Sequence, residues 1–151
     1  MGSCCEGENA YPLESGPQFE KTLRGAGYRF FEAGADEFWK PMSLVLNADR
    51  ISAPILVQTS DSEYEGGLDT AAAFRIRQKP FELYVFNDEG HFLSQPAHRL
   101  AMYERSVEWF EFWLMGRINC DPARAAQNER WRAMKGAPAV PDCAASLSAA
   151  P

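Results

Sequence analysis

The sequence predicts an α/β fold, and three patterns along the chain favour this class. Two short apolar runs, Ile55 to Val57 and Phe81 to Phe86, have the composition of buried strands. Apolar residues at helical spacing lie between these runs, and a longer helical pattern follows the second run. A strand, a helix and a second strand within about thirty residues form a crossover unit. The two strands are therefore expected to be parallel.

The segment before the first strand is expected to contain loop and short helices. Residues 1–17 are rich in Gly, Ser, Glu and Pro, which is typical of a loop. A short helix is expected from Phe19 to Leu23, and a second helix over Phe38 to Asn47. Asp36 has a residue type suited to the N-cap of that second helix.

Two helices are expected around the second strand. Leu68, Ala72 and Ile76 recur at helical spacing, and the residues before Pro80 end that helix. A longer helix is predicted from Pro96 to Met115. Its apolar stripe consists of Leu100, Tyr103, Val107, Phe110 and Leu114, with Met102, Trp109 and Trp113 beside it. We expect this helix to pack heavily.

Beyond Gly116 the composition shifts towards Ala, Pro, Arg and Ser. A short helix around Trp131, from Pro122 to Met134, is expected in this segment. The last fifteen or so residues have the composition of a disordered tail. The chain is accordingly divided into residues 1–117, part of an α/β domain, and a C-terminal extension over residues 118–151.

Composition excludes several classes of partner. The chain has 151 residues, 46% of them hydrophobic, and a net charge of −6, so the clustered Lys and Arg of a nucleic-acid-binding protein are missing. No apolar run approaches the roughly 18 residues that span a bilayer, and no secretion signal is visible. We therefore expect no nucleic-acid or membrane partner. The compartment stays open, with the cytoplasm favoured.

The cysteines and glycines give no sign of a cofactor. Cys4, Cys5, Cys120 and Cys143 lack metal-binding spacing, and we expect them to be reduced structural thiols. The Gly25 to Gly27 segment lacks the third glycine of a phosphate-binding loop, so a turn explains it better. No cofactor and no metal are predicted.

His91 is a candidate general base. It follows the second strand through a short loop, at the sheet edge where parallel sheets bind ligands. Imidazole titrates near neutrality and can take a proton from a serine hydroxyl and then return it. On position alone, a loop histidine without a role is the commoner case. The second histidine, His98, is expected to have a structural role in the first turn of the long helix.

Carboxylates on the neighbouring loop favour a catalytic role for His91. Asp61, Glu63 and Glu65 follow the first strand, and parallel strands present their ends together. A carboxylate there would accept the second imidazole N–H and fix the tautomer of the ring. Spacing alone does not choose among the three acids. The sequence contains no Gly-x-Ser-x-Gly nucleophile motif, which in hydrolases of this kind precedes both acid and histidine.

Four segments in this order resemble the end of the prolyl oligopeptidase family of serine peptidases. They are Pro54-Ile55-Leu56-Val57, Phe81-Glu82-Leu83-Tyr84-Val85-Phe86, Glu89-Gly90-His91 and Val107-Glu108-Trp109-Phe110-Glu111-Phe112-Trp113-Leu114. The resemblance implies the C-terminal portion of an α/β-hydrolase domain, with parallel strands, crossover helices and an incomplete sheet.

Within that family the chain is most similar to the lasso-peptide isopeptidases. Thr59-Ser60 occupies the place where most members have His-Gly, and Glu63 falls where the catalytic Asp would be. Hydrolases of this fold use either acid to orient the imidazole. The resemblance therefore implies Glu63 as the catalytic acid and His91 as the base, with Asp61 as the alternative acid.

The expected function follows from this resemblance. The chain would supply the acid and histidine of a serine peptidase that cleaves peptide or isopeptide bonds, with a lasso peptide as substrate. The nucleophile would come from the missing N-terminal half of the enzyme, so the chain alone would be inactive. The alternative is a catalytically inactive truncated module that acts only in binding or assembly.

Overall fold

Two parallel strands, β1 (Ile55–Ser60) and β2 (Phe81–Phe86), form the centre of the fold. They pair in register from Ile55 opposite Phe81 to Ser60 opposite Phe86. The structure is a computed structural model and describes residues 17–30, 33–136 and Cys143. Within these residues the sheet has two strands. The predicted parallel pair is confirmed, and β1 extends three residues beyond the expected Val57.

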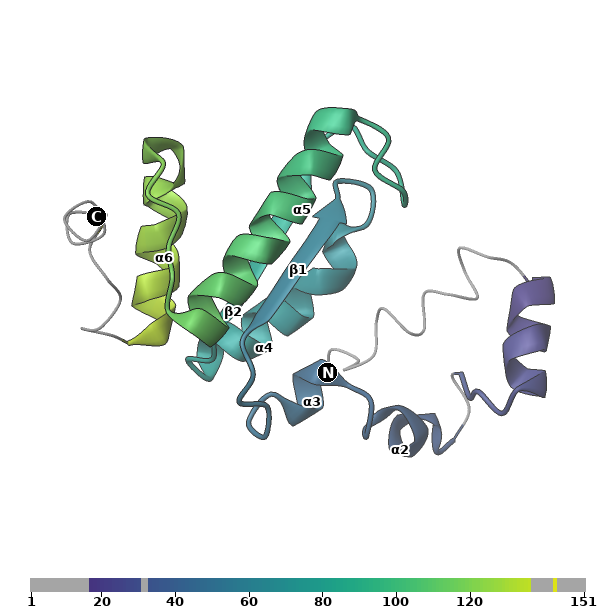
Figure 1. The fold of residues 1–151 in the computed structure, drawn as a ribbon. Helices are drawn as coiled ribbons and strands as arrows, with labels where there is room; N and C mark the ends of the chain where they lie inside the picture. Colours follow the sequence, from purple (N-terminus) through teal and green to yellow (C-terminus); the bar gives the residue numbers. More distant parts are fainter. Residues whose placement is uncertain (1–16, 31–32, 137–142, 144–151) are drawn as a thin grey trace.

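Helices cover both faces of this sheet. α4 (Leu68–Ile76) lies on one face, where Phe74 packs against Phe81 with their ring centroids 5.4 Å apart. α5 (Pro96–Phe110) crosses the other face, and Gln58 of β1 donates to the carbonyl of Met102 on this helix. α5 continues as a π-helix, η2 (Glu111–Met115), and ends at Gly116. In Figure 1, α5 runs alongside β1 and passes in front of β2, whereas α4 lies behind β1. The helices predicted over these segments are confirmed.

The segment after α5 packs on the same sheet face. A 3₁₀ turn, η3 (Pro122–Arg124), leads into α6 (Ala125–Lys135), in agreement with the expected helix. Trp131 of α6 is buried against Trp109 and Phe112, and its indole N–H donates to Glu82 of β2. Residues 118–136 are thus packed into the core around α5 and not merely attached to its end.

Cys120 and Cys143 form a disulfide, with Cα atoms 5.5 Å apart. The expectation of reduced thiols was therefore wrong for this pair. A sequence separation of 23 residues carries no local pairing signal, and only the fold brings the two cysteines together.

The segment before β1 differs from the single helix expected over residues 38–47. Residues 17–25 are helical, as predicted for Phe19 to Leu23. Further on, α2 (Ala35–Trp39) and α3 (Leu44–Asn47) are separated by a turn. Asp36 lies inside α2, and the N-cap of α3 is Ser43, whose hydroxyl accepts from the backbone N–H of Leu46. Pro41 explains the break, because a proline ring is incompatible with a continuous helix interior.

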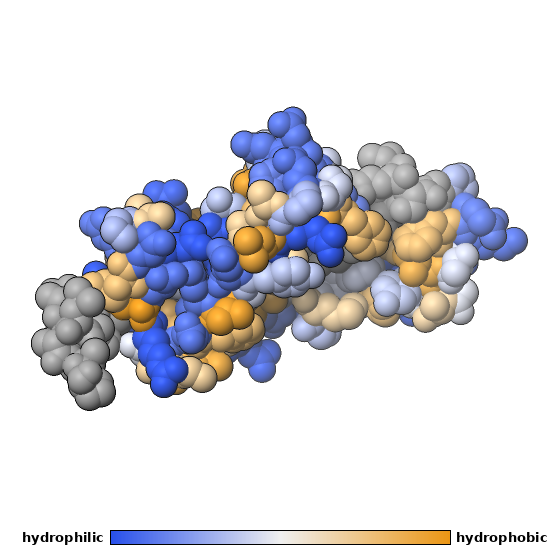
Figure 2. Space-filling model, turned by 45° about the horizontal axis from the view of Figure 1, so that its top comes forward, coloured by the Kyte–Doolittle hydropathy of each residue, from blue (hydrophilic) through white to orange (hydrophobic). Residues whose placement is uncertain are grey.

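The apolar stripe predicted on the long helix faces outward. Its five residues are exposed to between 57% and 76%. They are Leu100, Tyr103, Val107, Phe110 and Leu114. The face of α5 that packs is instead the one with Trp109, and η2 adds Phe112. The strands are also less covered than expected, because only Ser60 of β1 is fully buried. Figure 2 shows orange apolar patches between blue ones on one face of the molecule.

Two expectations concern residues outside the described part of the chain. These are the loop over residues 1–16 and the disordered tail, of which only Cys143 is described. Among the described helices, none has the length and apolar character that a membrane span requires.

Candidate active site

Two loops follow the C-terminal ends of β1 and β2 and lie side by side. The strand pairing continues one residue beyond β1, because the backbone N–H of Asp61 donates to the carbonyl of Phe86 at 2.9 Å. The first loop then turns into a 3₁₀ helix, η1 (Tyr64–Gly67). The second loop runs over residues 87–95 to the start of α5. Parallel strands thus bring the acidic loop next to the histidine loop.

Glu63 and His91 meet across these two loops. The carboxylate Oε1 of Glu63 lies 2.8 Å from Nδ1 of His91, which is a hydrogen-bond distance. The two side chains are 44% and 72% exposed, so the pair lies at the surface. The other ring nitrogen of His91, Nε2, has no hydrogen-bond partner among the described residues.

Asp61 has a different role in the structure. Its carboxylate accepts hydrogen bonds from the backbone N–H groups of Asp88 at 2.8 Å and Glu89 at 3.3 Å. These hydrogen bonds, the one from Asp88 first, lower the pKa of Asp61 below its usual value. Asp61 therefore holds the histidine loop by its backbone, whereas Glu63 binds the imidazole itself.

Glu89 was not recognised as important from the sequence. Its carboxylate is buried and accepts from the backbone of Ser94 at 2.7 Å and from Nδ1 of His98 at 2.8 Å. The Ser94 hydrogen bond makes the largest contribution in lowering the pKa of Glu89 to about 2, with the His98 bond adding to it. His98 also stacks on Phe86, with ring centroids 5.3 Å apart. Its expected place in the first turn of α5 is confirmed, and its partner there is Glu89.

The backbone of the histidine loop contains one unusual conformation. Asp88 has a positive φ of 54°, in the left-handed region that few side chains adopt. Gly90, the residue before His91, does not have a positive φ. The hydrogen bond from Asp88 to Asp61 accompanies the turn, so the loop geometry depends on Asp88 and not on the glycine next to the histidine.

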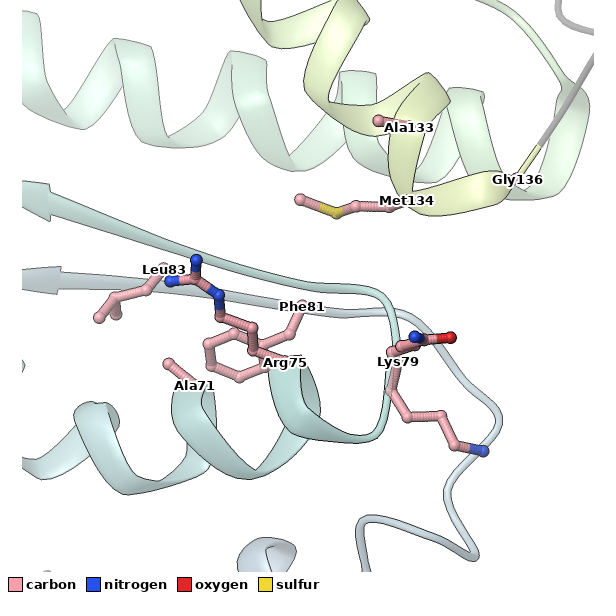
Figure 3. A pocket seen from close by; sticks show the side chains of 9 residues that line it. Ala71, Arg75, Lys79, Phe81, Leu83, Ala133, Met134 and Gly136 are labelled. Atoms are coloured by element: carbon pink, nitrogen blue, oxygen red, sulfur yellow. The ribbon is translucent and has the colours of Figure 1, made fainter.

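A pocket lies elsewhere on the molecule. It is bounded by Phe81 and Leu83 near the start of β2, by Arg75 of α4 and by Met134 of α6 (Figure 3). Glu63 and His91 follow the opposite ends of the strands and do not line it. In the described part of the chain, no group of three or more His, Cys, Asp or Glu side chains is arranged to hold a metal ion.

The geometry at Glu63 and His91 suits proton transfer. A carboxylate that accepts the Nδ1 proton leaves Nε2 as a proton acceptor and stabilises the imidazolium once it forms. No described serine hydroxyl is hydrogen-bonded to His91. Ser62 pairs instead with Ser60, at an Oγ to Oγ distance of 2.8 Å. His91, oriented by Glu63, can therefore accept a proton from a nucleophile. Among the described residues, no serine is placed to be that nucleophile.

Known proteins with similar sequences and structures contain this arrangement of elements. A lasso peptide isopeptidase, AtxE2 of Asticcacaulis excentricus, is 40% identical over 133 residues, which cover 88% of this chain and 19% of that protein. The solved structure of AtxE2 without ligand matches with a TM-score of 0.75 at 39% identity, over 89% of this chain and 20% of the other. A serine-to-alanine variant of AtxE2 with Astexin3-dC4 bound matches with a TM-score of 0.74 at 39% identity, over 85% and 20%.

The chain thus spans about a fifth of the length of these relatives. The structural match agrees with the predicted C-terminal portion of an α/β-hydrolase domain. The model of the prolyl oligopeptidase family matches residues 23–117, which is more than half of the chain. The resemblance inferred from the motifs around the two strands and His91 is therefore confirmed, and the chain belongs to the prolyl oligopeptidase family.

Proposed function

We propose that this chain forms the acid and base part of a serine peptidase active site, with Glu63 as the acid and His91 as the base. The nucleophilic serine would come from another part of the complete enzyme. The observation that carries the proposal is the hydrogen bond of 2.8 Å between Glu63 Oε1 and His91 Nδ1. The alternative acid, Asp61, is engaged with two backbone amides, which favours Glu63.

The proposed reaction is acyl transfer in two steps. Nε2 of His91 takes the proton of the serine hydroxyl as its oxygen attacks the carbonyl carbon of the scissile bond. His91 then gives this proton to the leaving nitrogen, and an acyl-enzyme remains. A water molecule then gives a proton to His91 and attacks the carbonyl carbon of the ester. His91 returns this proton to the serine oxygen, and the carboxylic acid product leaves. Glu63 keeps the Nδ1 proton directed at itself and stabilises the imidazolium in both steps.

The proposed substrate is the isopeptide bond that closes the ring of a lasso peptide. This proposal rests on the 40% identity to a lasso peptide isopeptidase and on the glutamate at the acid position. The isopeptide carbonyl is an amide carbonyl, so the same acid and base chemistry applies to it. An ordinary peptide bond is the competing substrate within the family.

The catalytic proposal is tested with a chimera. In the chimera, this chain replaces the corresponding fifth of AtxE2, so that AtxE2 supplies the serine and the rest of the fold. Incubation with Astexin3-dC4 is followed by mass spectrometry, in which hydrolysis adds one water to the peptide. We expect hydrolysis by the chimera and its loss in the His91→Ala variant. Equal hydrolysis with and without His91, in a correctly folded chimera, would exclude the proposed base.

The substrate needs a second experiment, because the chimera takes most of its substrate contacts from AtxE2. The complete enzyme, with its own substrate-binding residues in place of those of AtxE2, is incubated with threaded lasso peptides and with linear peptides of the same sequence. Cleavage of the threaded form at the isopeptide bond supports the isopeptidase assignment. Cleavage restricted to linear peptides would place the enzyme with the ordinary peptidases of the family.

A second candidate function is favoured by the exposed apolar stripe on α5. A catalytically inactive module would bind a partner through Tyr103, Phe110 and their neighbours, which are more than half exposed. A fluorophosphonate probe, which reacts with activated serines, separates the two functions. Labelling of the assembled enzyme that requires His91 supports catalysis, and assembly without any labelling supports the binding module.

A further inference from the structure

The carboxylate of Glu89 is an unusually well satisfied buried charge. Its Oε2 accepts from the backbone N–H and the hydroxyl of Ser94 at 2.7 and 3.0 Å. Its Oε1 accepts from the backbone N–H of Gln95 at 3.1 Å and from Nδ1 of His98 at 2.8 Å. The side chain has no exposed surface. A buried carboxylate is costly unless it is compensated in this way, so the four donors fix both oxygens in position.

The donors all belong to the beginning of α5. Gln95 is the N-cap of this helix, Ser94 precedes it, and His98 lies in its first turn. The N-terminus of a helix stabilises a nearby negative charge, because the free backbone N–H groups and the positive end of the helix dipole lie there. Glu89 lies two positions before His91 and therefore links the histidine loop to the start of the long helix α5.

The backbone of Glu89 makes contacts in the opposite direction. Its N–H donates to Asp61 at 3.3 Å, and its carbonyl accepts from the hydroxyl of Ser62 at 3.3 Å. Asp61 and Ser62 immediately precede Glu63. Glu89 thus contacts the loop of Glu63 through its backbone and the start of α5 through its side chain. It lies in the same loop as His91.

We propose that Glu89 is a positioning residue that holds His91 at hydrogen-bond distance from Glu63. The proposal rests on the proposed catalytic pair and explains how two surface loops keep that pair together. The exposed contact between Glu63 and His91 is of a type that stabilises little by itself. The short distance between Glu63 and His91 must therefore be maintained by the residues that hold the two loops. Glu89 is one of these residues, because it forms hydrogen bonds with the loop of Glu63 and with the start of α5.

The low pKa of Glu89, about 2, supports this role. A carboxylate with such a pKa stays ionised throughout the range in which imidazole groups titrate. The anchor therefore keeps its charge while the base gains and loses protons. Glutamine is a poor substitute, because its NH₂ group would face one pair of the N–H or O–H donors that now bind an oxygen.

The test uses the chain itself, labelled with ¹⁵N in its two histidines. Long-range proton and nitrogen correlations report the tautomer of each ring. We expect Nδ1–H in His91 of the unaltered chain, because Glu63 accepts this proton. In Glu89→Gln we expect the His91 nitrogen shifts to move towards those of Glu63→Gln, in which the acceptor is lost. The melting temperature distinguishes this effect from general unfolding.

Glu65→Gln is the matched control. Glu65 lies on η1 near Glu63, is exposed and undergoes the same change of charge. It should leave the His91 signals unchanged. If Glu89→Gln does not fold, His98→Ala removes one of the four donors and should produce a smaller shift of His91 in the same direction. Signals of His91 that stay unchanged in folded Glu89→Gln, or in His98→Ala if only that variant folds, would overturn the proposal.

Kinetics of the chimera provide a second readout. A misplaced base lowers the rate of the chemical step without changing substrate binding, so kcat should fall by about tenfold to a hundredfold and KM should stay within about twofold. Glu65→Gln should change neither constant. The proposed function fails if His91→Ala retains activity. The positioning role fails separately, if Glu89→Gln retains full kcat in a chimera that does require His91.

Discussion

Replacement of Trp131 gives the sharpest test of the packing of α6. This side chain is 1% exposed and has edge-to-face contact with Trp109, with ring centroids 5.1 Å apart. Phe112 lies on another side at 5.6 Å, and the indole N–H donates to the buried carboxylate of Glu82. Trp131→Ala removes the ring and this hydrogen bond together.

The expected cost follows from these contacts. Truncation of a buried tryptophan to alanine lowers the free energy of unfolding by about 3 to 5 kcal/mol. Trp131→Phe keeps most of the ring packing and loses the N–H donor to Glu82, which costs about 1 to 2 kcal/mol. With a urea m-value of about 2 kcal/mol/M, the two variants should lower the unfolding midpoint by about 2 M and by 0.5 to 1 M.

Urea unfolding of the chain, followed by circular dichroism, measures these shifts. Ile76→Ala is the control, because Ile76 is 78% exposed and its loss should change the free energy of unfolding by less than about 0.5 kcal/mol. If Trp131→Ala unfolds within about 0.3 M of the unaltered chain, α6 does not belong to the core, and the packing described for residues 118–136 is refuted.

Three other predictions concern the disulfide, the pH dependence and the outer face of α5. Cys120→Ser opens a loop with a sequence separation of 23 residues and should destabilise the oxidised chain by about 3 kcal/mol, measured by urea unfolding, with no effect under reducing conditions. Because the pKa of Glu89 is lowered from 4.5 to about 2, its stabilisation of the loop should be complete above pH 4.5 and decline as the pH falls towards 2. The amide shift of Ser94 should follow the protonation of Glu89 with a midpoint near pH 2, and a midpoint near the usual value of 4.5 would contradict the assigned contact. Phe110→Ser should leave the unfolding of the chain unchanged, because Phe110 is 60% exposed, and should lower the melting temperature of the chimera if the rest of the enzyme covers this face.

The elements of the fold were predictable where the sequence has a clear apolar run or apolar residues at helical spacing. β1, α4, β2 and α5 all lie where their apolar patterns place them. The outward orientation of the α5 stripe was not predictable, because this helix has apolar residues on two faces. Only the packing of Trp109 against α6 shows which face is inside. The stripe is thus an exposed apolar surface in the described part of the chain, and the lasso peptide isopeptidase that the chain matches is about five times longer.

The approach of an acid to His91 was predictable from the sequence, but the hydrogen bonds that surround this pair were not. Parallel strand ends predicted that an acid would approach His91, and family resemblance selected Glu63 over Asp61. The separate role of Asp61 depends on the direction of two loop amides, which a sequence does not reveal. Glu89 was missed because an acid beside Asp88 in a polar loop has the pattern of a solvated charge, although its side chain is buried.

The boundary expected at residue 117 remains a proposal about domains. It coincides with the end of the match to the family model. Packing does not stop there, because Glu108 of α5 accepts from Asn119 at 2.7 Å and from Arg124 at 2.9 Å. The disulfide adds a covalent link between Cys120 and Cys143.

The most direct test of the proposed catalytic pair is a double-mutant cycle in the chimera. His91→Ala, Glu63→Gln and the double variant are compared by kcat/KM on Astexin3-dC4. Residues that act as one unit have non-additive effects, so the double variant should be no slower than His91→Ala alone, within about twofold. If Glu63→Gln has no effect, or if the two losses multiply, the carboxylate and the imidazole do not work together.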